Sequence, residues 1–128
     1  MENIRIEATN RSPAVSFDFA RHHLRIEGES YPEDVLAFYG PILASLEPYL
    51  ASLRSGRCRF DLSLVYFNSG SAKALMLLLE KLDEAAASGA AIDIYWYYDE
   101  KDDTMKELGE EFGEDLRHAA FHLEVMGR

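Results

Sequence analysis

The segment FDLSLVYFNSGSAKALMLLLEKL, residues 60–82, contains a strand pattern, a short polar turn and a helix pattern in immediate succession. Phe60 to Phe67 is rich in Val, Leu, Phe and Tyr and ends abruptly at small polar residues, which is typical of a strand buried on both faces. The apolar residues that follow have the spacing of one helix face, and they are Leu75, Leu78, Leu79, Leu82 and Ala86. The segment therefore predicts a buried strand, a turn at 68–71 and a helix over about 71–88, with Ser69 at the surface of the helix N-terminus.

The turn formed by Asn68, Ser69, Gly70 and Ser71 supports two interpretations. The first turn of a helix has backbone N–H groups without intrahelical partners and a partial positive charge, so it can hold an anion such as a phosphate. Gly70 has no Cβ and leaves room for the backbone of a partner or for a nucleotide. Asn, Ser and Gly are equally typical of plain N-caps, so the pattern alone leaves capping and anion binding both open.

The N-terminal residues predict an antiparallel hairpin. Apolar and polar residues alternate in 15–19 and again in 24–26, which is the period-two pattern of half-buried strands. Residues 4–8 allow a further short edge strand before Pro13 and its polar neighbours interrupt regular structure. We expect this hairpin to lie at one side of the sheet.

A long helix is expected after the hairpin. Ser30 and Pro32 are typical of a helix start, and acidic residues follow them where the helix dipole favours negative charge. The apolar stripe of this helix consists of Val35, Phe38, Ile42, Leu46, Tyr49, Leu50 and Leu53. Pro41 and Pro48 lie inside the stripe, so we expect a kink or a break near one of them.

The C-terminal part predicts two more strands and one more helix. The strands are expected at 91–98 and 119–126, with the helix between them from about Thr104 to Phe112. Aromatic residues on both faces of the first strand are explained equally by core packing and by a surface available to a partner. Together the segments predict one α/β domain over 1–128, with about three helices and a mixed sheet of about five strands: an antiparallel N-terminal hairpin and otherwise mostly parallel strands.

The charge balance excludes several classes of partner. The chain of 128 residues has a formal net charge of −10 and a sequence pI of about 4.8, so nucleic acid and anionic membranes are poor partners. Cys58 is the only cysteine and cannot form an internal disulfide, and no apolar run approaches the roughly twenty residues of a membrane span. The acidic first residues lack the pattern of a signal peptide, so we expect a cytoplasmic protein.

The densest group of carboxylates is Asp99, Glu100, Asp102 and Asp103. Hard cations such as Mg²⁺ bind several oxygens, so one hypothesis is a metal-dependent enzyme that acts on a small ligand. A solvated loop that caps the next helix accounts for the same residues. The sequence has no phosphate-binding loop motif, nucleophile elbow, CxxC pair or dinucleotide motif. We therefore predict a protein that is not an enzyme and that uses no metal or other cofactor.

The strand and turn at 60–71 resemble the core of STAS domains, the anti-sigma-factor-antagonist fold. In that family an aspartate-containing strand leads into an Asp-Ser-Ser-Gly turn, and the serine before the glycine is phosphorylated. Ser69 occupies that position here, although Asn68 and Ser69 replace the usual Asp-Ser-Ser order. The resemblance implies a STAS-like fold in a different subfamily.

A closer resemblance, over nearly the whole chain, is to the SiaC family of biofilm regulatory phosphoproteins. The segments that carry it are Ser12–Ala14, Gly28–Glu33, Phe60–Met76, Tyr97–Asp99 and Glu110–Phe112. The Ser-Tyr-Pro-Glu block at 30–33 and the Leu-Val-Tyr-Phe-Asn-Ser block at 64–69 are the most specific. In this family a serine/threonine kinase phosphorylates the hydroxyl after the asparagine, and a PP2C-type phosphatase removes the phosphate. The unphosphorylated protein binds and stimulates a diguanylate cyclase.

The resemblance implies that Ser69 is the phosphorylated residue, with Ser71 as the alternative acceptor. The surface expected to bind partners comprises Tyr66, Asn68, Ser69, Gly70, Ser71 and Lys73. The implied function is a non-enzymatic partner switch in c-di-GMP signalling and biofilm control, with a kinase, a phosphatase and a diguanylate cyclase as partners. Two other hypotheses stay open: the metal-dependent enzyme that uses 99–103, and a constitutive scaffold in which Ser69 is only a helix cap.

Overall fold

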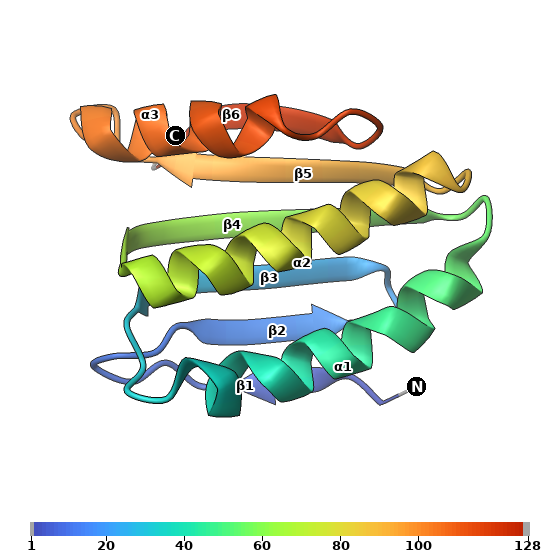
Figure 1. Ribbon diagram of the computed structural model, residues 1–128, viewed down its shortest axis with the longest axis horizontal. Helices are drawn as coiled ribbons and strands as arrows, with labels where there is room; N and C mark the ends of the chain where they lie inside the picture. The colour runs from blue at the N-terminus through green and yellow to red at the C-terminus, as the bar shows by residue number, and fades with distance from the viewer. Residues whose placement is uncertain (1, 127–128) are drawn as a thin grey trace.

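Six strands form one sheet in the order in which they occur in the chain (Figure 1). The structure is a computed structural model that describes residues 2–126. The strands are β1 (Ile4–Ile6), β2 (Ala14–Asp18), β3 (His23–Ser30), β4 (Arg57–Phe67), β5 (Ala91–Tyr98) and β6 (Ala120–Val125). β1, β2 and β3 pair antiparallel, and the strands from β3 to β6 pair parallel. The predicted fold class is therefore confirmed, with β1 adding a short edge strand to the expected five.

Three helices cover one face of the sheet (Figure 1). They are α1 (Val35–Leu53), α2 (Ser69–Ala87) and α3 (Asp103–Glu114). Each helix connects two neighbouring parallel strands, and right-handed connections that proceed in one direction across a sheet place every helix on the same side. Within residues 2–126, no helix combines the length and the apolar character needed to cross a membrane.

The strand β4 is covered on one face only, which corrects the prediction of a strand buried on both faces. Its pairing with β3 shifts register between Gly28 and Glu29, so that Val65 is an extra residue in β4. As a result Phe67 returns to the core side, where its ring packs on aromatic neighbours, while Val65 and Tyr66 are about half exposed. We call the uncovered surface of the sheet the open face.

The core lies between the sheet and the helices. Its largest fully buried side chains are Phe17, Leu24, Ile26, Tyr39, Ile42, Leu46, Phe60, Leu62, Leu64, Leu75, Leu78 and Trp96. Burying each such side chain contributes about 1.5–3 kcal/mol, so this layer supplies most of the favourable free energy of folding. The helix positions follow the predicted apolar spacing, with Tyr39 as an addition to the stripe of α1.

The helix α1 begins later than the sequence predicted. Asp34 is its N-cap, and the Asp34 Oδ1 atom accepts a hydrogen bond from the Ala37 N–H at 3.0 Å. Ser30, the expected start, is the last residue of β3 and is fully buried. The predicted start was wrong because Ser30 forms its hydrogen bonds with hydroxyl groups that are distant in the chain.

The helix α1 continues unbroken through both of its prolines. A proline removes the hydrogen bond to the carbonyl four residues earlier, and for Pro41 and Pro48 these carbonyls belong to Ala37 and Ala44. All four residues are exposed, so water can bond the freed carbonyls. The break that the sequence pattern allowed therefore does not occur between residues 35 and 53.

The helix α3 packs closely on β5 because Gly109 faces Trp96. A Cβ atom at Gly109 would lie 2.7 Å from ring atoms of Trp96 and from the Leu123 Cδ2 atom. The Trp96 Nε1–H group also donates a hydrogen bond to the Met105 carbonyl at 3.1 Å. The close approach thus satisfies the one polar atom of a fully buried indole.

We expect Gly109→Ala to lower the free energy of unfolding by about 1–3 kcal/mol, because the added methyl overpacks the Trp96 contact. Gly40→Ala is the matched control: no atom lies within 4 Å of a Cβ at Gly40, so this helix substitution should raise stability by about 0.5–1 kcal/mol. Urea denaturation monitored by Trp96 fluorescence measures both. Shifts of the same sign would contradict this packing.

Candidate functional site

The candidate site lies at the edge of the sheet where the parallel strands end. β4 ends at Phe67 and α2 begins at Ser69, so the predicted turn is shorter than four residues. α1 begins at the same edge, and Figure 1 shows the N-terminal ends of α1 and α2 on the same side of the molecule. Loops at the carboxyl ends of parallel strands are where α/β proteins usually bind ligands and partners.

Asn68, and not Ser69, is the N-cap of α2. The Asn68 Oδ1 atom accepts a hydrogen bond from the Ser71 N–H at 2.9 Å, and the Asn68 N–H donates to the Ser30 carbonyl at 3.1 Å. Ser69 is exposed, and within residues 2–126 its hydroxyl has no hydrogen-bond partner. The capping role is therefore filled by its neighbour, and the Ser69 hydroxyl is available at the surface, as the sequence predicted.

Gly70 allows the first turns of α1 and α2 to meet. A Cβ atom at Gly70 would lie 3.0 Å from the Val35 Cγ2 atom, and Val35 is the first residue of α1. Each helix N-terminus carries a partial positive charge from its unpaired N–H groups. A negative group on Ser69 would lie at the N-terminus of α2, while the N-terminus of α1 already has the Asp34 carboxylate as its cap.

Ser71, the alternative acceptor, lies in the core. Its side chain is fully buried, and its Oγ accepts a hydrogen bond from the Ser30 Oγ at 2.9 Å. The Ser30 Oγ is also 2.5 Å from the Tyr39 hydroxyl, and burial raises the pKa of Tyr39 against the opposing effect of these hydrogen bonds. This buried trio of hydroxyls connects β3, α1 and α2 directly beneath Ser69.

Three large apolar side chains are exposed on the elements that meet at this edge. Leu36, in the first turn of α1, is 83% exposed, and Val65 and Tyr66 at the end of β4 are about half exposed. The Tyr66 ring packs edge-on against Tyr31 with 5.7 Å between ring centres. Large apolar groups that remain exposed together mark a surface that binds another protein. We call Leu36, Val65, Tyr66 and Ser69 the rim.

The helix α2 extends this surface with a stripe at four-residue spacing. Ser69, Lys73 and Leu77 are all exposed and lie on one side of the helix. The sequence pointed to Tyr66 and Lys73 but missed Leu36 and Leu77. Both are apolar residues outside the buried stripes of their helices, which is a signal that could have found them.

Two of the four carboxylates at 99–103 accept local backbone hydrogen bonds. The Asp102 Oδ1 atom accepts from the Met105 N–H at 3.0 Å and caps α3, and the Asp99 Oδ1 atom accepts from the Lys101 N–H at 2.9 Å. No group of three or more His, Cys, Asp or Glu side chains in the described part of the chain has a geometry that could hold a metal ion. These contacts favour the loop interpretation of the acidic segment.

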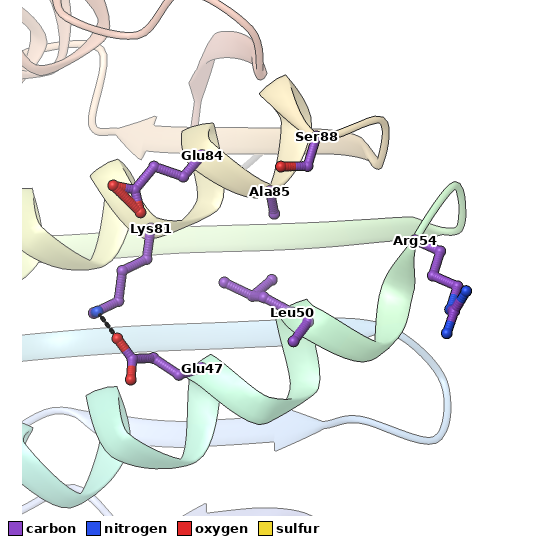
Figure 2. Close-up of a pocket in the computed structure, with 8 residues that line it drawn as sticks. Glu47, Leu50, Arg54, Lys81, Glu84, Ala85 and Ser88 are labelled. Atoms are coloured by element: carbon purple, nitrogen blue, oxygen red, sulfur yellow. Dashed lines mark hydrogen bonds and ion pairs between the residues drawn. The ribbon is translucent and has the colours of Figure 1, made fainter.

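A groove of about 420 Å³ lies between α1 and α2 at the end opposite Ser69 (Figure 2). An ion pair between Glu47 and Lys81 spans it, and Leu50 and Ala85 are among its apolar lining residues. Two further charged residues, Arg54 and Glu84, line the groove without forming an ion pair with another described residue.

Comparisons with known proteins identify the family of this chain. Residues 6–126 match the model of the SiaC family of regulatory phosphoproteins. The crystal structure of apo-SiaC from Pseudomonas aeruginosa is 33% identical with a TM-score of 0.89, and the match covers 97% of this chain and 99% of that chain. A chain in the crystal structure of the diguanylate cyclase SiaD in complex with its activator SiaC, also from P. aeruginosa, is 33% identical with a TM-score of 0.90, over 95% of this chain and 98% of that one.

A curated relative is an uncharacterised protein of P. aeruginosa strain UCBPP-PA14, 35% identical over 115 residues, which is 90% of both chains. The fold and these matches define a regulatory phosphoprotein. The chain belongs to the SiaC family.

Because Ser71 is buried and hydrogen-bonded whereas Ser69 is exposed, substitutions at these two residues form a matched pair of variants. Ser71→Ala should lower the free energy of unfolding by about 1–2 kcal/mol, because it leaves buried hydroxyls without a partner. Ser69→Ala should change it by less than about 0.5 kcal/mol, because the hydroxyl is exposed and forms no bond that folding requires. Chemical denaturation measures both, and a loss of about 1 kcal/mol for Ser69→Ala would revive the cap interpretation.

Proposed function

We propose that this protein is a partner-switching regulator controlled by reversible phosphorylation of Ser69. The observation that carries the proposal is the exposed Ser69 hydroxyl, which has no intramolecular partner in residues 2–126 and lies at a helix N-terminus. A kinase needs an accessible hydroxyl on a surface it can cover. Ser71 lacks this access because it is fully buried.

The proposed output is control of a diguanylate cyclase. The related SiaC of P. aeruginosa is described as the activator of the diguanylate cyclase SiaD, and this chain shares its fold along nearly the whole length. In the proposed mechanism the unphosphorylated rim packs on the cyclase through Leu36, Val65 and Tyr66. The bound cyclase would cover Ser69 and exclude water from it.

Phosphorylation would oppose this contact by placing charge inside it. A phosphoserine carries about −1.5 to −2 charges at pH 7, and burying that charge against apolar groups is costly. A loss of about 3 kcal/mol already weakens binding more than a hundredfold. The N-terminus of α2, where Ser69 lies, would stabilise the phosphate on the free protein, which also favours the unbound state.

The regulator acts as a substrate and binding partner and not as an enzyme in this proposal. A serine/threonine kinase adds the phosphate, a PP2C-type phosphatase removes it, and both meet the chain in the cytoplasm. The competing metal-dependent enzyme would use the carboxylates at 99–103. It is less favoured because Asp99 and Asp102 are engaged as caps.

Incubation with the cognate kinase, ATP and Mg²⁺ should add one phosphate, which mass spectrometry should map to Ser69. Ser69→Ala should abolish the modification, and Ser69→Thr should keep it because the hydroxyl is retained. Ser71→Ala is the matched control and should be modified like the unaltered protein. Phosphate on another residue, with Ser69→Ala still fully modified, would remove Ser69 from the mechanism.

Binding of a purified cyclase tests the rim. Leu36→Ala should weaken the complex by about tenfold, since an exposed leucine that is buried in an interface contributes about 1–2 kcal/mol. Phosphorylated protein should bind more than about a hundredfold more weakly. Lys106→Ala, on the exposed side of α3, is the control and should bind normally. Unchanged affinity for Leu36→Ala, with Trp96 fluorescence confirming the fold, would place the cyclase elsewhere.

A further inference from the structure

The open face has a preorganised centre that the proposed switch does not use. Asp61 is 5% exposed, and its carboxylate accepts a hydrogen bond from the Arg59 Nε–H at 3.1 Å and lies 2.6 Å from the His23 Nε2 atom. Arg59 also donates to the Tyr97 hydroxyl at 2.9 Å, and its guanidinium lies 4.2 Å from the centre of the Tyr95 ring. Arginine and tyrosine held in fixed positions are typical of interface centres, because little side-chain entropy is lost on binding.

Charges on the open face are separated along the strands. Arg25 and Arg57 lie toward the beginnings of β3 and β4, whereas Glu27 and Glu29 lie toward the end of β3 and Glu124 toward the end of β6. All five side chains are exposed. Within residues 2–126, none of them has an oppositely charged group at ion-pair distance. The face therefore has an unpaired basic half and an unpaired acidic half.

The carboxylates within the basic half do not cancel its charge for a partner, because each already has a partner of its own. Asp61 is bound by Arg59 and His23, and Asp93 lies 3.1 Å from the His122 Nε2 atom. Asp18 is in contact with Asn3 and Arg21. What remains available for an incoming surface is the positive charge of Arg25 and Arg57.

We infer that the open face packs against the same face of a second copy of this chain. Arg25 shares a cross-strand row with Asp61 and Tyr95, and Glu27 lies in the next row with Ser63. A two-fold axis that runs across the strands between these rows places each Arg25 over the partner's Glu27 and each Tyr95 over the partner's Tyr97. The basic half of one copy then meets the acidic half of the other.

The presence of unpaired charges of both signs favours a second copy over an acidic or a basic partner protein. A partner protein with only acidic or only basic groups would pair with the opposite charges in one half of the open face and be repelled by the other half. A two-fold arrangement of two copies pairs the charges of both halves. The net charge of −10 on each copy opposes association, but it is screened over about 8 Å at physiological salt. The open face and its margin carry the arginines Arg5, Arg21, Arg25, Arg57 and Arg59 alongside the carboxylates Asp18, Glu27, Glu29, Asp61, Asp93 and Glu124. The charges of this face therefore nearly balance, and repulsion across it is weaker than the net charge of the whole chain suggests.

Sedimentation analysis of the unphosphorylated protein over a range of concentrations tests the inference. The apparent mass should rise toward twice the 14.5 kDa of the monomer. Arg25→Glu and Glu27→Arg should each weaken self-association by at least about tenfold, because like charges then face each other at two symmetric places. An equimolar mixture of the two variants should associate again, since each faces a complementary charge on the other.

Lys106→Glu and Glu110→Arg on the exposed side of α3 make the same changes of charge elsewhere and should associate like the unaltered protein. Trp96 fluorescence confirms the fold of every variant. A chain that stays monomeric at all concentrations, or a mixture of variants that does not associate, would overturn the inference and leave the open face to a different partner. Either result is independent of phosphorylation at Ser69, which is measured separately.

Discussion

The right-handedness of the connections between parallel strands determines which surfaces of this molecule are covered by helices and which are exposed. β3, β4, β5 and β6 lie side by side in chain order, so right-handed connections place α1, α2 and α3 on one face. The same rule places the first turns of α1 and α2 at one edge, where Gly70 lets them meet and Ser69 is exposed. It also leaves the other face of the sheet without a covering layer. The rim and the open face are thus two consequences of one topological constraint.

Patterns within a single segment could be predicted from the sequence, and contacts between distant segments could not. The strand, turn and helix at 60–82 were found from local spacing, because that spacing reflects one buried side of each element. Ser30 was misplaced because its partners, Tyr39 and Ser71, lie 9 and 41 residues away. The half-covered state of β4 was also not predicted. Asp61 and Ser63 alternate with apolar residues, but the extra residue at Val65 ends this alternation in the apolar run 64–67, which suggested burial on both faces.

The candidate site, too, was predictable where it depends on neighbouring residues and not where it depends on contacts between distant segments. The position of Ser69 at a helix start follows from adjacent residues and was predicted, and the resemblance to a known family indicated its modification. The division of roles among Asn68, Ser69 and Ser71 required the structure, because all three residues are plausible caps and only geometry shows which oxygen accepts the Ser71 N–H. Leu36 could have been identified from the sequence as an apolar residue outside the buried stripe of α1. Its location at the same edge as Ser69 required the structure, in which Gly70 of α2 lies against Val35 of α1.

The proposed switch acts through local desolvation and not through the overall charge of the protein. One phosphate adds at most about −2 to a molecule that already carries −10, and fields from exposed charges decay within about 8 Å at physiological salt. Long-range repulsion would therefore change little. A partner with basic groups directly over Ser69 would even bind the phosphorylated form more tightly. For phosphorylation to release the cyclase, the part of the cyclase that covers Ser69 must be apolar or acidic. An apolar surface is the one that the exposed side chains of Leu36, Val65 and Tyr66 are suited to contact.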